Sequence, residues 1–81
     1  MTNKQKYIEA FVQEFAISES LLAEDLTYNS IPEWDSVGHM SLIAHLEETF
    51  DIVMEMDDII DFGSFNKGIE ILAKYEVDFS I

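Results

Sequence analysis

Two stretches of this chain repeat apolar residues at the spacing of an α-helix, and a longer stretch without that spacing separates them. In the first, one helical face carries Ile8, Phe11, Val12 and Phe15. Thr2 and Gln5 have the spacing of a capping box, so we predict a helix over residues 3–15. The second stretch predicts a helix over residues 36–50, with an inward face of Val37, Met40, Ile43, Ala44, Leu46 and Phe50. Two amphipathic helices of this kind must bury their apolar faces against each other, which favours an all-α fold.

The last third of the chain predicts two further helices. Acidic residues open a short helix over residues 57–61, where the helix dipole favours negative charge. Ser64 can cap a last helix over residues 65–75, in which Gly68 costs about 1 kcal/mol relative to alanine and indicates close packing or a mobile end. Residues 76–81 are predicted as a tail. The fold class is therefore all-α, with three longer helices, one short helix and a long loop between the first two.

That long loop covers residues 16–35 and needs apolar anchors of its own to pack in a compact domain. Pro32 fixes its own φ and biases the preceding residue toward an extended conformation, so no helix continues through this point. The expected anchors are Leu21, Leu22, Leu26, Tyr28 and Ile31. Trp34 is expected to be a further anchor over the core.

Ser36 lies where the loop becomes the second predicted helix. The first N–H groups of a helix lack intrahelical partners and the dipole is positive at that end, so an anionic group on the serine oxygen would be favoured there. Asp35 and Ser36 are both good N-cap residues, and only one of them is needed as a cap. A structural serine and a modified serine are the two interpretations.

Charge and composition narrow the classes of function. The formal net charge is −13, which disfavours nucleic acid and anionic membranes and indicates basic protein partners. The absence of cysteine excludes disulfides and cysteine-based metal sites. No apolar run approaches the roughly 20 residues that span a bilayer, and no signal-peptide pattern is visible. We expect a single cytoplasmic domain over residues 1–81, monomeric and without membrane insertion.

The residues around Ser36 resemble the attachment motif of the acyl carrier protein family, in which an Asp-Ser-Leu-like triplet opens the second helix. Here the triplet is Asp35-Ser36-Val37. The similarity continues through Met40, Leu42, Ile43, Leu46, Glu47, Glu48, Phe50 and Asp51, and the apolar spacing of both flanking segments is similar to the four-helix carrier fold over nearly all 81 residues.

The resemblance implies a carrier and not an enzyme. A phosphopantetheinyl transferase would move 4′-phosphopantetheine from coenzyme A onto Ser36, and acyl groups would ride as thioesters on the thiol of that arm. Recognition by the transferase and other partners would fall on Asp35, Val37, Met40, Glu47 and Glu48. The partners implied are that transferase, an acyl- or aminoacyl-loading ligase and acyl-transferring enzymes with basic docking patches. Possible contacts of the arm or its acyl group are Trp34, His39, Leu42, Leu46 and Ile60.

Two departures from the family pattern bear on the cargo. Trp34 precedes the triplet where housekeeping fatty-acid carriers have small residues, and Gly38-His39 follows where they have an acid. The sequence is thus more similar to stand-alone carriers of specialised pathways. An aminoacyl carrier, for example for D-alanine, or a peptidyl carrier is the alternative. An acyl chain inserted between the helices would be lined by Leu42, Leu46, Ile60 and Ile69, all expected in the core.

Other sites are less consistent with the sequence. Asp35, Ser36 and His39 lack the Gly-x-Ser-x-Gly turn and the third orienting group of a serine hydrolase. His39 and His45 do not share a helical face as metal ligands would, so we predict surface or partner-contact histidines and no metal site. The acids after Asp51 lack EF-hand spacing and form either a docking surface or a solvated face. The rival from another class is an acidic helical interaction module with no modification.

Overall fold

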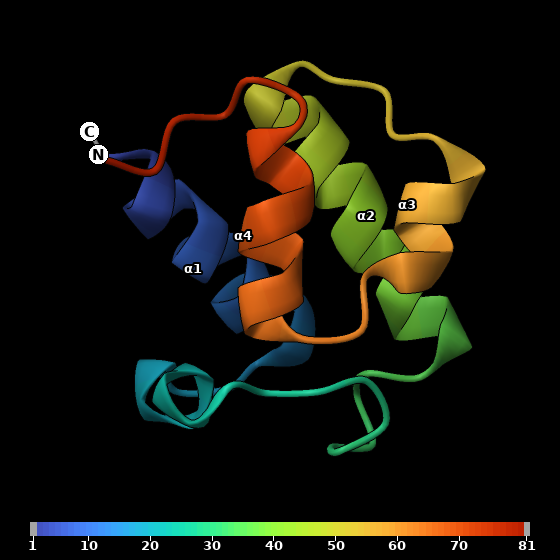
Figure 1. Cartoon of the computed structure of the whole chain (residues 1–81). Helices are drawn as coiled ribbons and strands as arrows, with labels where there is room; N and C mark the ends of the chain where they lie inside the picture. The colour runs from blue at the N-terminus through green and yellow to red at the C-terminus, as the bar shows by residue number, and fades with distance from the viewer. Residues whose placement is uncertain (1, 81) are drawn as a thin grey trace.

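The computed structural model describes residues 2–80, which form helices joined by loops (Figure 1). Within these residues there is no β-strand, and the bridge between Thr27 and Ser64 is isolated. The elements in chain order are α1 (Asn3–Phe15), the 3₁₀-helix η1 (Glu19–Glu24), α2 (Ser36–Phe50), α3 (Met56–Asp61) and α4 (Phe65–Ala73). The all-α prediction is confirmed, and η1 is a short helix that the sequence did not predict.

The predicted bounds of the first two helices agree with the structure because their capping residues are strong. Thr2 and Gln5 form both bonds of a capping box at the start of α1. Ser64 caps α4 by accepting a hydrogen bond from the backbone N–H of Lys67 at 3.0 Å. α4 ends at Ala73, slightly earlier than predicted, because the chain turns there. No helix within residues 2–80 has both the length and the apolar character needed to cross a membrane.

Aromatic side chains fill the space between α1, α2 and α4. Phe11 lies at their centre, with its ring centroid 5.4 Å from Trp34 and 5.3 Å from Phe65. The largest side chains with less than 2% exposure include Tyr7, Phe11, Phe15, Trp34 and Phe62. Since each buried large apolar side chain contributes about 1.5–3 kcal/mol, this cluster is the main stabiliser of the fold.

The inward face of α2 differs from the prediction. Val37 and Met40 are 74% and 52% exposed, and Ala44 is also exposed. The buried face instead contains Leu42, Ile43 and Leu46, preceded one turn earlier by the half-buried His39. These positions follow i, i+3, i+4 and i+7 spacing. Because this buried face begins with a polar residue, it is rotated by part of a helical turn from the predicted face.

The long loop is tied to the junction between α3 and α4, as Figure 1 shows where it passes below them. The Tyr28 N–H donates to the Gly63 carbonyl at 2.9 Å, and the Phe65 N–H donates to the Leu26 carbonyl at 2.8 Å. Leu22 and Leu26 are buried, as predicted. Leu21 and Tyr28 are 36% and 39% exposed, but the Tyr28 ring still packs edge-on against Trp34 with centroids 6.3 Å apart. Backbone hydrogen bonds, together with the buried leucines, hold this loop.

The segment after α4 packs against the core, whereas the sequence predicted a tail over residues 76–81. Val77 is only 8% exposed, and the ring of Phe79 lies 5.4 Å from that of Tyr7. The Asn3 side-chain amide donates to the Asp78 carbonyl at 2.9 Å, which fixes this segment beside the start of α1. Val77 and Phe79 are apolar residues of this segment, and both pack against the core. Ile81 lies outside the described residues.

Candidate functional site

Ser36 is the first residue of α2 and is exposed. Its neighbour Asp35 is the N-cap residue, and an Asp35 carboxylate oxygen accepts a hydrogen bond from the Gly38 N–H at 2.8 Å. Of the two candidate caps in the sequence, Asp35 therefore takes the structural role. The Ser36 hydroxyl is left at the positive end of a long helix without being needed for its cap.

Gly38 allows the loop backbone to lie against the first turn of α2. A Cβ atom at this position would lie 2.0 Å from the Glu33 carbonyl oxygen, a distance that no real Cβ tolerates. Glycine is thus required by a close backbone approach. In the sequence Gly38 stands out only as a departure from the family pattern, although an isolated glycine in a first helical turn is a signal for such an approach.

A groove of about 340 Å³ opens beside Ser36, between α2, α3 and the long loop. Its lining is largely apolar. The residues that line it are Tyr28, Ser36, His39, Met40, Met56, Ile59, Ile60, Phe62 and Gly63. The structure thus brings together Ser36, Met40, His39 and Ile60 from the predicted set. Tyr28, Met56 and Ile59 were not predicted for the site, since only the tertiary structure places the loop and α3 next to Ser36.

His39 forms the inner side of this groove. The prediction of a surface histidine is therefore wrong for this residue. Its Nδ1 accepts a hydrogen bond from the Trp34 indole N–H at 3.0 Å. Its Nε2 lies 2.8 Å from the Ile59 carbonyl oxygen, which can only accept, so Nε2 carries the proton. The imidazole is also nearly coplanar with the Trp34 ring, with centroids 6.2 Å apart and an interplanar angle of 17°. His39 thereby joins the loop, α2 and α3.

The other residues predicted to contact an arm or acyl group are in two different environments. Trp34, Leu42 and Leu46 are fully buried in the core. Ile60 is 71% exposed on α3, so its assignment to the core is wrong, and it lines the groove instead. No residue of α3 is buried, and Ile60 is one of its exposed side chains.

The predicted recognition residues are also divided. Val37, Met40 and Glu48 are exposed on α2. Glu47 is half-buried, and its carboxylate accepts a hydrogen bond from the Met54 N–H at 2.9 Å, so it has a structural role in the turn after α2. His45 is on the other side of α2 and pairs with Glu14 of α1 at 2.7 Å.

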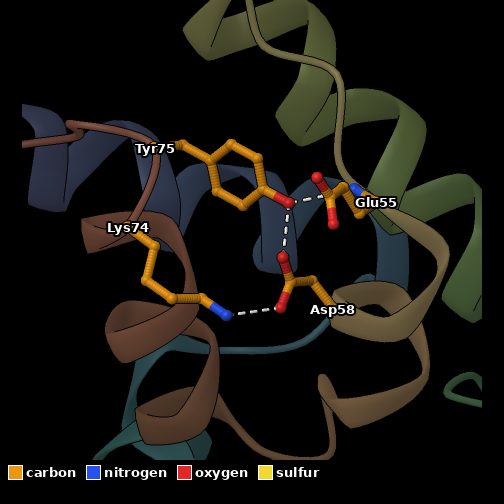
Figure 2. Close-up of polar contacts among 4 residues, drawn as sticks. All are labelled: Glu55, Asp58, Lys74 and Tyr75. Atoms are coloured by element: carbon orange, nitrogen blue, oxygen red, sulfur yellow. Dashed lines mark hydrogen bonds and ion pairs between the residues drawn. The ribbon is translucent and has the colours of Figure 1, made fainter.

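Polar contacts hold α3, the outer wall of the groove, against the end of α4 (Figure 2). One oxygen of the Asp58 carboxylate accepts a hydrogen bond from the Lys74 ammonium and the other from the Tyr75 hydroxyl, each at 2.5 Å. The Tyr75 hydroxyl in turn accepts one from the Glu55 N–H at 2.9 Å. These bonds from Lys74 and Tyr75 lower the pKa of Asp58 below its usual value.

His39 is not free to act as a general base for Ser36. Both ring nitrogens of His39 are engaged, one by Trp34 and one by Ile59, so neither is free to take a proton from Ser36. Among the residues that the structure describes, no three histidine, aspartate or glutamate side chains are grouped to hold a metal ion. No protein-family model and no curated protein matches the chain.

Proposed function

We propose that this chain is a carrier protein of the acyl carrier type, which holds acyl intermediates as thioesters on a 4′-phosphopantetheine arm attached to Ser36. The observation that carries this proposal is the position of Ser36, exposed at the start of α2 while Asp35 takes the cap. The family resemblance around this serine supplies the identity of the arm.

The attachment chemistry fits the residues present. In the transferase reaction the Ser36 oxygen would form a bond to the phosphorus that bears pantetheine, while the pyrophosphate bond of coenzyme A breaks and adenosine 3′,5′-bisphosphate leaves. The hydroxyl proton would pass to the transferase. The resulting phosphodiester is an anion at the N-terminus of a long helix, where unpaired N–H groups and the dipole favour it. The chain has no cysteine, so the arm would supply the thiol for thioester chemistry.

The helix order is consistent with the carrier fold. α1, α2 and α4 are the longer helices, α3 is the short one, and η1 lies within the long connection before Ser36. We propose that these form the four-helix carrier bundle, with η1 as an ordered turn of its loop. The whole chain would then act as one monomeric carrier domain and would perform no reaction of its own.

Partner enzymes would dock around Ser36. Val37 and Met40 offer exposed apolar contacts, and the net charge of −13 favours enzymes with basic patches, such as the transferase, a loading ligase and acyl-transferring enzymes. Rim charges of this kind mainly speed association and make it sensitive to salt. Trp34 and Gly38-His39 distinguish the attachment region from that of housekeeping fatty-acid carriers, so a specialised pathway is proposed.

Intact-mass measurement after co-expression with a broad-specificity phosphopantetheinyl transferase tests the proposal. The wild-type chain is expected to gain the mass of one phosphopantetheine. Ser36→Ala should gain nothing, whereas Ser41→Ala, at an exposed serine of the same helix, should be modified like the wild type. A wild-type chain that remains unmodified would contradict the carrier function.

The rival function is an acidic helical interaction module that acts without modification. It is favoured by the exposed apolar side chains, which are Val37, Met40, Val53, Met56 and Ile60. An unmodified wild-type chain in the same experiment would support this rival.

A further inference from the structure

The interior of the bundle next to Ser36 is filled by rings. Trp34 and Phe62 are at most 1% exposed, and their ring centroids lie 6.4 Å apart. The centroid of the Phe11 ring lies 5.4 Å from that of Trp34 and 6.3 Å from that of Phe62. Rings of this size bury about 150–250 Å² each and have few rotatable bonds, so they make room for a guest less readily than aliphatic side chains. A chain that entered between them would have to displace several at once.

The route from Ser36 into this interior is closed by His39. Its ring lies between the groove and Trp34, is nearly coplanar with the Trp34 ring and meets Phe62 edge-on, with His39–Phe62 centroids 6.0 Å apart. Hydrogen bonds at both nitrogens fix this orientation, one to the Trp34 indole and one to the Ile59 carbonyl. Moving the ring aside would break both bonds and leave a buried indole N–H without a partner.

We infer that the bundle is closed to its cargo, and that the arm on Ser36 carries small acyl groups, aminoacyl groups included, which remain in the groove outside His39. This inference rests on the proposed carrier function and names its substrate class. The groove volume of about 340 Å³ is at the small end of the roughly 300–1,000 Å³ typical of ligand sites. Because Ser36 itself lines the groove, a short tethered group reaches it at high effective concentration. Trp34, Leu42 and Leu46 then act as core residues and do not contact the cargo.

Methyl groups on either side of His39 report where a cargo lies. Met40 and Met56 line the groove, while Leu42, one turn along α2 from His39, is fully buried and does not line it. The experiment loads the wild-type chain with acetyl- and octanoyl-phosphopantetheine, confirms both by intact mass, and compares methyl NMR spectra and thermal midpoints. We expect the Met40 and Met56 methyl signals to differ between the two forms and the Leu42 methyl signals to stay in place. The two midpoints should agree within about 2 °C, because a shift of about 4–8 °C marks a substantial stabilisation in a domain of this size.

An octanoyl group that moves the Leu42 methyl signals, or raises the midpoint by more than about 4 °C over the acetyl form, would overturn the inference while the carrier function stands. Failure to attach either arm to Ser36 would instead overturn the carrier function itself. His39→Ala tests the closing residue. In this variant octanoyl, and not acetyl, is expected to move the Leu42 methyl signals, and unchanged signals in the folded variant would contradict the part assigned to His39.

Discussion

α4 and α3 follow each other in the chain and are held to the rest of the molecule in different ways. α4 buries Phe65, Ile71 and Leu72, whereas α3 buries none of its residues and is tied by polar contacts through Asp58 and the Ile59 carbonyl. A buried large apolar side chain contributes about 1.5–3 kcal/mol, but an exposed polar pair contributes about 0–1. α3 should therefore open before the rest of the fold.

The weakly held helix α3 is also the one that lies beside the candidate site. α3 forms the outer wall of the groove beside Ser36, while α1, α2 and α4 form the aromatic core behind it. The side of the molecule that partners and cargo would contact is thus the weakly held one. Ser36 is positioned by the firmly packed α2 and not by α3.

The largest predicted effect removes an aromatic ring from the core. Phe11→Ala is expected to lower the free energy of unfolding by about 3–5 kcal/mol, because it leaves a cavity among packed rings. Ile60→Ala on α3 is the matched comparison and should change it by no more than about 0.5 kcal/mol, since Ile60 is 71% exposed. Chemical denaturation measures both. Equal losses would mean that α3 is packed as firmly as the core.

The next effect concerns the backbone contact that positions Ser36. Gly38→Ala is expected to cost about 1–3 kcal/mol, because the new Cβ would meet the Glu33 carbonyl oxygen at 2.0 Å. Gly63→Ala is the control, because its Cβ would lie at an ordinary contact distance of 3.7 Å from the Asp61 carbonyl oxygen. Denaturation curves for the two variants should differ clearly. Similar curves would argue against the close approach at the start of α2.

His39→Ala removes the side chain that links Trp34 of the core to the Ile59 carbonyl of α3. We expect a loss of about 1–3 kcal/mol, mainly because the Trp34 indole N–H is left buried without an acceptor. His45→Ala removes a partly exposed pair with Glu14 and should cost about 0–1 kcal/mol. Amide hydrogen exchange should also rise in α3 for the His39 variant alone. Unchanged exchange there would contradict the role of His39 in holding α3.

The smallest effect on global stability is expected at the contacts of Asp58. Its pKa is lower in the folded protein because Lys74 and Tyr75 donate hydrogen bonds to the ionised carboxylate. The stabilisation is therefore fully present above the pKa of an unfolded aspartate and is lost as the pH falls through the lower, folded value. Asp58→Asn should destabilise α3 at neutral pH, and its difference from the wild type should vanish in strong acid.

Thermal unfolding of Asp58→Asn and of the wild type, measured from neutral to strongly acidic pH, gives their difference in stability. Asp57→Asn on the same helix is the control for removing a negative charge. A difference between Asp58→Asn and the wild type that persists unchanged in acid would show that the ionised carboxylate is not what holds α3 to α4.

Local signals in the sequence were enough for the helix ends and for the position of Ser36. Thr2 with Gln5, Asp35 and Ser64 are strong capping residues that act within a few positions of themselves, so α1 and α2 have the predicted bounds. The same signals predicted that one residue of the Asp35-Ser36 pair would be spare as a cap. Close packing at Gly68, one of two alternatives, is also seen, because a Cβ there would lie 2.1 Å from the Tyr7 hydroxyl.

Side-chain environments that depend on distant segments could not be read in this way. His39 looks like a surface residue by type, yet it belongs to the buried stripe because Trp34 and the Ile59 carbonyl satisfy both of its nitrogens. Ile60 looks like a core residue by type, yet no helix covers it.

Capping and apolar spacing are properties of neighbouring residues, so the helix starts, the all-α fold and the serine at the start of α2 could be predicted locally. The meeting of the loop and α3 beside that serine, the bond between His39 and Trp34 behind it and the inward packing of Val77 depend on the tertiary arrangement. These features depend on which surfaces remain to be covered once the helices have packed, and that is a property of the whole chain.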